Sequence, residues 1–310
     1  MRHTRQLHSR AFADLRNFRG VLLAITVTLV SVGCGHPSPA EDVDLDTLRD
    51  VYLKANKKIE TLQLRWTRFI GLESFNDATE SISNKNENEL KLKVPKSYYR
   101  WKTLSGKALL DEIEVYDGET SKSYWPLSNE GRVNAKVART YVERLVPIPF
   151  LQLIDSETLL SLLENDRLKM DAKKASIDGS SCYVLTYESK QANHKIYVDP
   201  DIGYMPRRIE KYNVHPDIPG RYYLSQRRIF KDYINPEPAL WFPKRIEVES
   251  FRPSSKTSTL ILVIVTEIVL NQELPDDTFT LTFPSNTNVY VESEPTVWKS
   301  LKSLMGSWLQ

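Results

Sequence analysis

Alternation of apolar and charged residues with a period of two is the feature that most restricts the fold of this chain. In the stretch 89–94, three apolar side chains (Leu90, Leu92 and Val94) alternate with lysines. Residues 111–118 repeat the pattern and end in an Asp-Gly turn. Because successive side chains of a strand point to opposite faces, this pattern predicts an antiparallel sheet with one face buried and the other in water. Further strands are predicted at 98–103, 121–127, 182–189, 194–199, 205–213, 222–234 and 242–251.

Two helices are expected to cover this sheet. Residues 45–62 carry apolar side chains at spacings of three and four, which places them on one helix face. In a second stretch, 145–165, Asp155 or Ser156 is the predicted N-cap, and four leucines follow it. The polar stretch 73–88 is expected to be a long hairpin loop. The order helix, strands, helix, strands indicates an α+β fold without internal repeats.

Residues 1–33 have the features of a secretory signal peptide. Arginines precede an apolar run at 20–33, which is shorter than the roughly 20 residues that a permanent membrane helix needs. The Ser-Val-Gly-Cys stretch at 31–34 resembles a bacterial lipobox, in which the cysteine thiol is acylated and becomes the new N-terminus. This pattern predicts a lipid on Cys34, followed by a tether over 34–42. Plain secretion stays an alternative, because Ser31 and Gly33 also satisfy an ordinary small-x-small cleavage rule.

Charge and composition exclude several functional classes. The net charge of +2 belongs to the signal segment, whose arginines are balanced by a single acid, Asp14. Without a basic excess in the mature chain, nucleic acid is not an expected partner. Cys182 lies in an alternating segment and is expected to be a small core residue, with a bridge to Cys34 as the alternative. Histidines and cysteines lack metal-binding spacing, and no nucleophile motif occurs, so we expect no metal, no cofactor and no enzymatic activity.

Four segments carry motifs that recur in one order. They are the opening helix running into LRWTRFIG (64–71), a Pro-basic-aromatic strand and its Asp-Gly hairpin (94–103 and 114–133), an Asp-Pro-x-x-Gly-x-x-Pro hairpin (196–210), and an Asn-x-x-Leu-Pro-Asp-x-x-Phe closing strand (270–284). Together they resemble the half-barrel lipoprotein-carrier superfamily of LolA, LolB and RseB-like proteins. The resemblance covers residues 43–293 and implies a curved antiparallel sheet, or half-barrel, with helices packed on its concave face.

Relatives of this kind use the apolar space between helix and sheet for acyl chains, or the sheet surface for protein partners. Aromatic residues in the first half of the sheet are therefore the predicted apolar lining of a ligand space. The alternative is that they form the core under the helices. The residues are Trp66, Phe69, Tyr99, Trp101, Tyr116, Tyr124 and Trp125.

The stretch 257–270 reads as a strand that is apolar on both faces, because Leu260 to Val265 are all apolar. Something must cover its second face. The amphipathic C-terminal segment 294–310 is the preferred candidate, and a partner or the membrane surface is the alternative.

These inferences combine into a predicted function. The chain is expected to be a lipid-anchored protein on the periplasmic side of the bacterial cell envelope that binds or carries a lipid or an acyl chain such as palmitate. A non-catalytic sensor or scaffold that binds other envelope proteins is the first alternative. A hydrolase of envelope polymers, which would need a polar cleft with two close carboxylates, is the second.

Overall fold

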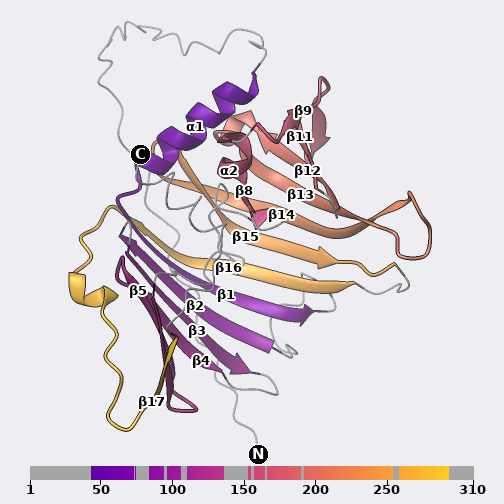
Figure 1. Ribbon diagram of the computed structural model, residues 1–310. Coiled ribbons are helices and arrows are strands. Elements are labelled where there is room, and N and C mark those ends of the chain that lie inside the picture. Colours follow the sequence, from indigo (N-terminus) through magenta and orange to yellow (C-terminus); the bar gives the residue numbers. More distant parts are fainter. Residues whose placement is uncertain are drawn as a thin grey trace, which may run out of the picture. The chain divides into compact units, whose positions relative to one another are not determined.

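The computed structural model describes residues 43–72, 74, 84–93, 96–105, 110–135, 153–154, 157–164, 166–189, 192–253 and 258–292 (Figure 1). The predicted signal peptide, Cys34, the tether and the C-terminal segment 294–310 lie outside these residues.

A single large sheet runs through the described part of the chain. Its strands are ordered β10-β11-β12-β13-β14-β15-β16-β1-β2-β3-β4-β5-β6-β17, and β9 pairs with β11 beside this path. Neighbours are antiparallel except β17 and β6, which run parallel. The sheet is curved and does not close (Figure 1). Its strands are β1 Thr61–Leu72, β2 Asn84–Lys93, β3 Lys96–Ser105, β4 Asp111–Tyr116, β5 Thr120–Trp125, β6 Glu130–Ala135, β9 Lys169–Met170, β10 Ala175–Ile177, β11 Ser180–Glu188, β12 Ala192–Asp199, β13 Met205–Val214, β14 Tyr222–Glu237, β15 Leu240–Ser250, β16 Thr259–Leu270 and β17 Asn288–Glu292.

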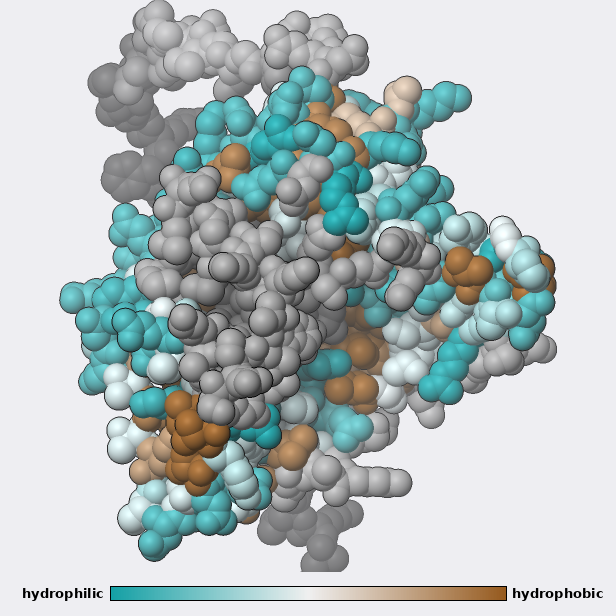
Figure 2. Space-filling view, in the orientation of Figure 1, coloured by the Kyte–Doolittle hydropathy of each residue, from teal (hydrophilic) through white to brown (hydrophobic). Residues whose placement is uncertain are grey.

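The predicted α+β half-barrel is therefore confirmed, with two differences in its strands. The expected loop 73–88 is too long, because β2 already begins at Asn84 and pairs with β1 from there. The expected closing strand 270–284 is wrong: residues Asp276–Phe279 form a 3-10 turn, η3, and the last strand is β17. The β13–β14 hairpin projects from the sheet (Figure 1), and apolar residues are visible on it (Figure 2).

Helix α1, Leu45–Lys57, begins where Asp44 accepts a hydrogen bond from the backbone N–H of Thr47 at 2.8 Å. This bond lowers the pKa of Asp44. The helix is shorter than the predicted 45–62. Its end is set by Asn271, whose side chain accepts from the N–H of Glu60 and donates to the carbonyl of Lys58, both at 2.9 Å. Those backbone groups are consequently unavailable for another helical turn.

Helix α2, Leu159–Glu164, is the second predicted helix and is shorter than the stretch 145–165. The hydroxyl of Thr158 accepts from the N–H of Ser161 at 3.0 Å and caps it. Two short strands, β7 Leu153–Ile154 and β8 Glu157–Thr158, precede it as a separate pair. The expected caps Asp155 and Ser156 lie outside the described residues.

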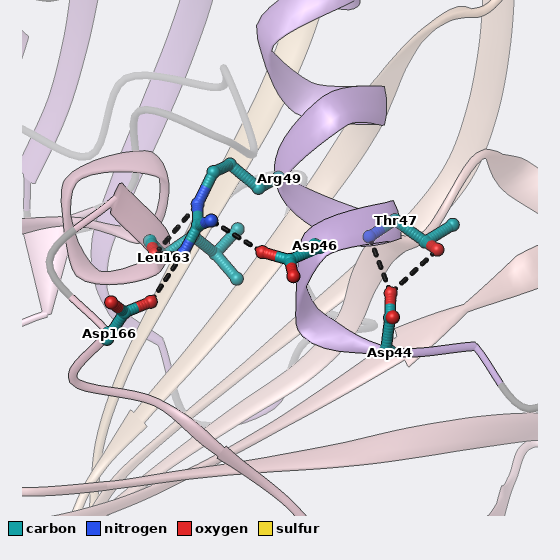
Figure 3. A network of polar contacts seen from close by, with 6 residues as sticks. All are labelled: Asp44, Asp46, Thr47, Arg49, Leu163 and Asp166. Atoms are coloured by element: carbon teal, nitrogen blue, oxygen red, sulfur yellow. Dashed lines mark hydrogen bonds and ion pairs between the residues drawn. The ribbon is translucent and has the colours of Figure 1, made fainter.

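Arg49 joins the two helices (Figure 3). Its guanidinium donates twice to the carbonyl of Leu163 at the end of α2, at 2.7 and 3.1 Å. It also forms ion pairs with Asp46 and Asp166, each at 2.5 Å. One arginine thus satisfies a helix carbonyl and holds α2 beside the first turns of α1.

Both helices pack on the concave face of the sheet. Leu48 and Tyr52 of α1 and Leu162 of α2 are fully buried and belong to one apolar cluster. The same cluster takes side chains from β1, β2, β3 and β11 to β16, and includes Phe230 and Phe242. This cluster is the core that supports the rest of the sheet.

Strand β16 is buried on both faces, as its sequence predicted. Val263 and Val265 join the helix-side core, whereas Leu262 belongs with Phe69 to a cluster on the other face. Leu262 and Val263 are both fully buried. Whether the C-terminal segment covers the second face stays a prediction, because that segment lies outside the described residues.

The segment 271–287, called the strap from here on, crosses the convex face of β3 to β6. Phe279 packs on Val115, and the ring of Phe283 lies on Gly131, where a Cβ atom would come within 2.6 Å of Phe283 Cε1. Lys93 and Lys96 pair with Asp276 at 3.0 and 3.2 Å. The strap thereby brings β17 alongside β6.

Candidate functional site

Five of the seven predicted aromatic residues lie on the helix-facing side of the sheet. Cross-strand pairing determines this placement, because residues directly opposite one another share a face. Trp66, Asn88 and Trp101 form one row across β1, β2 and β3. Tyr99 lies in the next row, opposite Leu90. We call Trp66, Tyr99, Trp101, Tyr116 and Trp125 the aromatic wall.

Direct contacts hold part of the aromatic wall in place. The rings of Trp66 and Tyr99 have centroids 6.2 Å apart and are tilted by 39°. The Tyr99 hydroxyl donates to Oδ1 of Asn88 at 2.7 Å. With the amide of Asn86 oriented to satisfy its neighbours, its oxygen accepts from the indole N–H of Trp101 at 3.3 Å. Trp66 and Tyr99 are buried, and Trp101 is half-buried and packs against the same core. Trp125 is half-buried as well.

Phe69 and Tyr124 lie on the opposite, convex face. Phe69 packs with Leu72, Leu260 and Leu262. Tyr124 meets Phe283 of the strap edge-on, with centroids 6.2 Å apart. These two residues are therefore separated from the aromatic wall by the sheet itself.

Polar residues share the concave face with the aromatic wall, and the sequence interpretation missed them. Asn86, Asn88, Glu114 and Ser121 are all buried there, and the Ser121 hydroxyl donates to Glu114 at 3.2 Å. The sequence does contain a signal for them, because Asn84, Asn86 and Asn88 continue the two-residue period of Leu90 and Leu92. Residues 84–88, which were expected to be part of a loop, therefore belong to the strand. The wall is thus mixed in polarity, which suits an amphipathic ligand better than a pure hydrocarbon.

Asn88 has a particular property within this wall. It is 7% exposed, and its side-chain nitrogen has no hydrogen-bond acceptor among the described residues. A buried amide N–H left without an acceptor costs roughly 1–3 kcal/mol. A ligand oxygen between Trp66 and Trp101 that accepts a hydrogen bond from this N–H would remove the penalty.

A hollow of about 430 Å³ opens on the convex face, away from the helices. The side chains of Arg65, Glu89 and Arg100 line it and are already paired: Arg65 lies 3.0 Å from both Glu89 and Glu267, and Arg100 lies 2.8 Å from Asp111. Trp66 and Asn88 also border the hollow, but by the alternation of β1 and β2 their side chains belong to the opposite, helix-facing side. This hollow is shallow and charged, and it does not offer the apolar surroundings that an acyl chain needs.

Glu210 is the centre of a second polar cluster on the convex face. It is 5% exposed and accepts hydrogen bonds from the hydroxyls of Tyr212 and Tyr197 at 2.7 and 3.1 Å. Arg227 lies 3.3 Å away. Burial alone raises the pKa of Glu210, but these hydrogen bonds and the cations Arg227 and Arg208 outweigh it and lower the pKa below its usual value. Burial and the carboxylate together raise the pKa of Tyr197 to about 12.

We expect Glu210→Gln to lower the free energy of unfolding by about 2 kcal/mol at neutral pH. Because the folded-state pKa is lowered, the contribution of the carboxylate is complete above the ordinary value of 4.5 and is lost as the pH falls through the folded-state pKa. Urea unfolding at neutral and acidic pH checks this. The deficit of the variant should shrink in acid, whereas the exposed Glu87→Gln should change little; a deficit independent of pH would contradict the assignment.

Within the described part of the chain, no group of three His, Cys, Asp or Glu side chains is arranged to hold a metal ion. None of the described helices is long and apolar enough to cross a bilayer. Cys182 is buried and unpaired, and burial raises the pKa of its thiol to about 11.

No family model matches this chain, and no curated protein matches it. Solved structures do. A Vibrio parahaemolyticus domain assigned to outer membrane lipoprotein sorting is 9% identical with a TM-score of 0.46, over 76% of this chain and 97% of that domain. A LolA superfamily protein from Nitrosomonas europaea is 12% identical with a TM-score of 0.43, over 77% and 98%. An uncharacterized conserved protein from Thermus thermophilus is 11% identical with a TM-score of 0.35, over 79% and 98%. Such identities and scores transfer neither a ligand nor a residue role to this chain.

Proposed function

We propose that this chain is a non-catalytic binding protein of the bacterial cell envelope, anchored by a lipid on Cys34, that holds an acyl-chain lipid against the aromatic wall. The observation that carries the proposal is the gathering of five aromatic side chains from β1, β3, β4 and β5 on the helix-facing side of the sheet. Ring faces of Trp and Tyr offer large apolar areas with few rotatable bonds, which suits contact with a flexible hydrocarbon.

The polar residues of the same face support an esterified acyl chain over a bare hydrocarbon. The side-chain nitrogen of Asn88 is buried, and Asn88 lies between Trp66 and Trp101 in the same cross-strand row. An ester or amide carbonyl oxygen is the ligand group that would accept a hydrogen bond from this donor. The sequence resemblance to lipoprotein carriers and the lipobox-like Cys34 support the same class of ligand and the periplasmic location.

Lipid extraction and a binding assay test the proposal. Protein purified from envelope fractions should release acyl-chain lipids that mass spectrometry identifies, and its N-terminal peptide should carry the lipid on Cys34. Trp101→Ala should weaken uptake of a fluorescent acyl ester roughly tenfold, because a large ring contact is lost.

Tyr124→Ala is the matched control, since Tyr124 is an aromatic residue of the same sheet on the convex face. It should bind the acyl ester as the unaltered protein does. Equal losses in the two variants, or no saturable uptake by the unaltered protein, would contradict the proposal.

A second candidate function, a scaffold for other envelope proteins, is favoured by β17. Among the described strands nothing pairs with its outer edge, and Val289, Tyr290 and Val291 are exposed. β17 has no proline, and its single charged residue, Glu292, stands at its end. An edge strand of this kind is a natural place for another chain to add a strand. Crosslinking in solubilised membranes tests it: a specific protein captured by the unaltered chain and lost in Val291→Lys supports the scaffold.

A further inference from the structure

The turn between β13 and β14 carries a group of exposed apolar side chains that the ligand proposal does not use. We call residues 214–222 the hairpin tip. Val214, Ile218 and Tyr222 are 44%, 41% and 46% exposed. The hairpin projects at the right of Figure 1, and brown patches lie there in Figure 2. Three large apolar side chains exposed close together in one turn form a patch, and such patches commonly mark a contact site.

The hairpin tip is held in one conformation by its own hydrogen bonds. The N–H of His215 donates to the carbonyl of Arg221 at 2.7 Å, and the N–H of Arg221 donates to the carbonyl of Ile218 at 3.2 Å. Gly220 has a φ of 75°, which glycine adopts without strain. Pro216 and Pro219 restrict the backbone further. The apolar groups are therefore displayed before any partner binds, and little ordering entropy remains to be lost on contact.

Polar groups at the hairpin tip fit a phosphate-bearing surface. Tyr222 and Tyr223 combine an apolar ring with a hydroxyl, a composition that is enriched at the membrane–water interface. Arg221 and Arg252 are exposed and outnumber the exposed acid of the hairpin tip, Asp217. Arg252 lies at the same end of the sheet, because the N–H of the preceding Phe251 donates to the carbonyl of Ser225 at 2.8 Å. Guanidinium groups beside an apolar tip can bind lipid phosphates while the tip enters the acyl region.

We propose that the hairpin tip is a membrane-contact site that inserts Ile218, Val214 and Tyr222 into the surface of a glycerophospholipid bilayer. A projecting, convex tip suits a lipid bilayer, because lipid molecules can rearrange around an inserted group. This contact uses none of the residues of the aromatic wall. It gives the sheet a second, reversible attachment to lipid.

Vesicle co-sedimentation tests the proposal with the chain that begins at Gly35, which keeps every described residue and lacks the anchoring cysteine. The probe is vesicles of phosphatidylethanolamine and phosphatidylglycerol. The unaltered chain should sediment with them. Ile218→Asp should bind roughly tenfold more weakly, since burial of one aliphatic side chain changes a partition coefficient by about that factor. Arg221→Ala should weaken binding at low salt and have less effect at high salt.

Leu127→Asp is the matched control, because Leu127 is 63% exposed in the β5–β6 turn and undergoes the same change of charge. It should bind vesicles as the unaltered chain does, and circular dichroism should confirm that both aspartate variants are folded. Equal losses in the two variants, or no sedimentation of the unaltered chain, would overturn the proposal. So would unchanged vesicle binding by Ile218→Asp together with loss of a crosslinked protein, which would make the hairpin tip a protein contact.

Discussion

Arg207→Ala is expected to lower the free energy of unfolding by about 3 kcal/mol, because it leaves a buried carboxylate without its cation. Asp199 is fully buried. One of its oxygens lies 2.8 Å from Nε of Arg207, and the other accepts the N–H of Asp201 at 2.9 Å. Removing the guanidinium leaves the charge of Asp199 with one backbone donor in a site that water does not reach. Few surface arginines would have an effect of this size.

Urea denaturation measures this prediction. Arg221→Ala, which removes an exposed arginine of the next hairpin turn, is the control and should change stability by less than about 0.5 kcal/mol. Asp199→Asn combined with Arg207→Ala should be less harmful than the sum of the two single changes, since the pair is then removed together. A loss below about 1 kcal/mol for Arg207→Ala would show that Asp199 finds another partner.

Tyr52→Ala is expected to cost about 4 kcal/mol, the usual range for deleting a fully buried aromatic ring. Tyr52 is fully buried between α1 and the sheet, and its hydroxyl donates to the carbonyl of Tyr204. Burial also raises the pKa of Tyr52 above its usual range, which favours the protonated hydroxyl that donates this hydrogen bond.

Tyr52→Phe separates the ring from the hydroxyl. It keeps the packing and removes one hydrogen bond to the turn, so a loss of about 1 kcal/mol is expected. Thermal and urea unfolding of both variants check the prediction. If the phenylalanine variant lost as much as the alanine variant, the hydroxyl and not the ring would hold α1 on the sheet.

Both predictions concern one structural unit, the Asp-Pro-x-x-Gly-x-x-Pro hairpin and the helix that packs on it. Gly203 of this turn has a φ of 64°, and a Cβ atom there would lie 3.2 Å from the ring of Trp241. The motif that suggested the family resemblance therefore has a structural explanation in this chain. It closes a turn, and it provides the carbonyl to which α1 is tied.

Strand parity alone shows that the seven predicted aromatic residues cannot all lie on one face of the sheet. Tyr124 and Trp125 are adjacent in one strand, so they must point to opposite faces. Trp66 and Phe69 are three apart, which has the same consequence. Parity does not tell which member of each pair faces the helices, because that depends on which strands pair and in which register.

The course of the strap and the pairing of β17 could not be predicted from the sequence, for a different reason. The family resemblance implied a closing strand over 270–284, yet Phe279 and Phe283 of the strap cover the convex face of β4 and β6. The strand that follows it, β17, pairs with β6, which is more than a hundred residues away in the chain. Local pattern carries no information about a pairing over that separation.

Alternation of side chains along each strand was sufficient to predict a one-sided antiparallel sheet with covering helices, because the period of a strand is a local property of the backbone. The same local chemistry predicted the start of α1 and the doubly buried β16. Only the tertiary structure decided where α1 ends, which aromatic residues form the wall, that Asn86 and Asn88 join them, and where the strap runs. Each of these depends on contacts between residues distant in sequence, and such contacts are set by packing and cross-strand register.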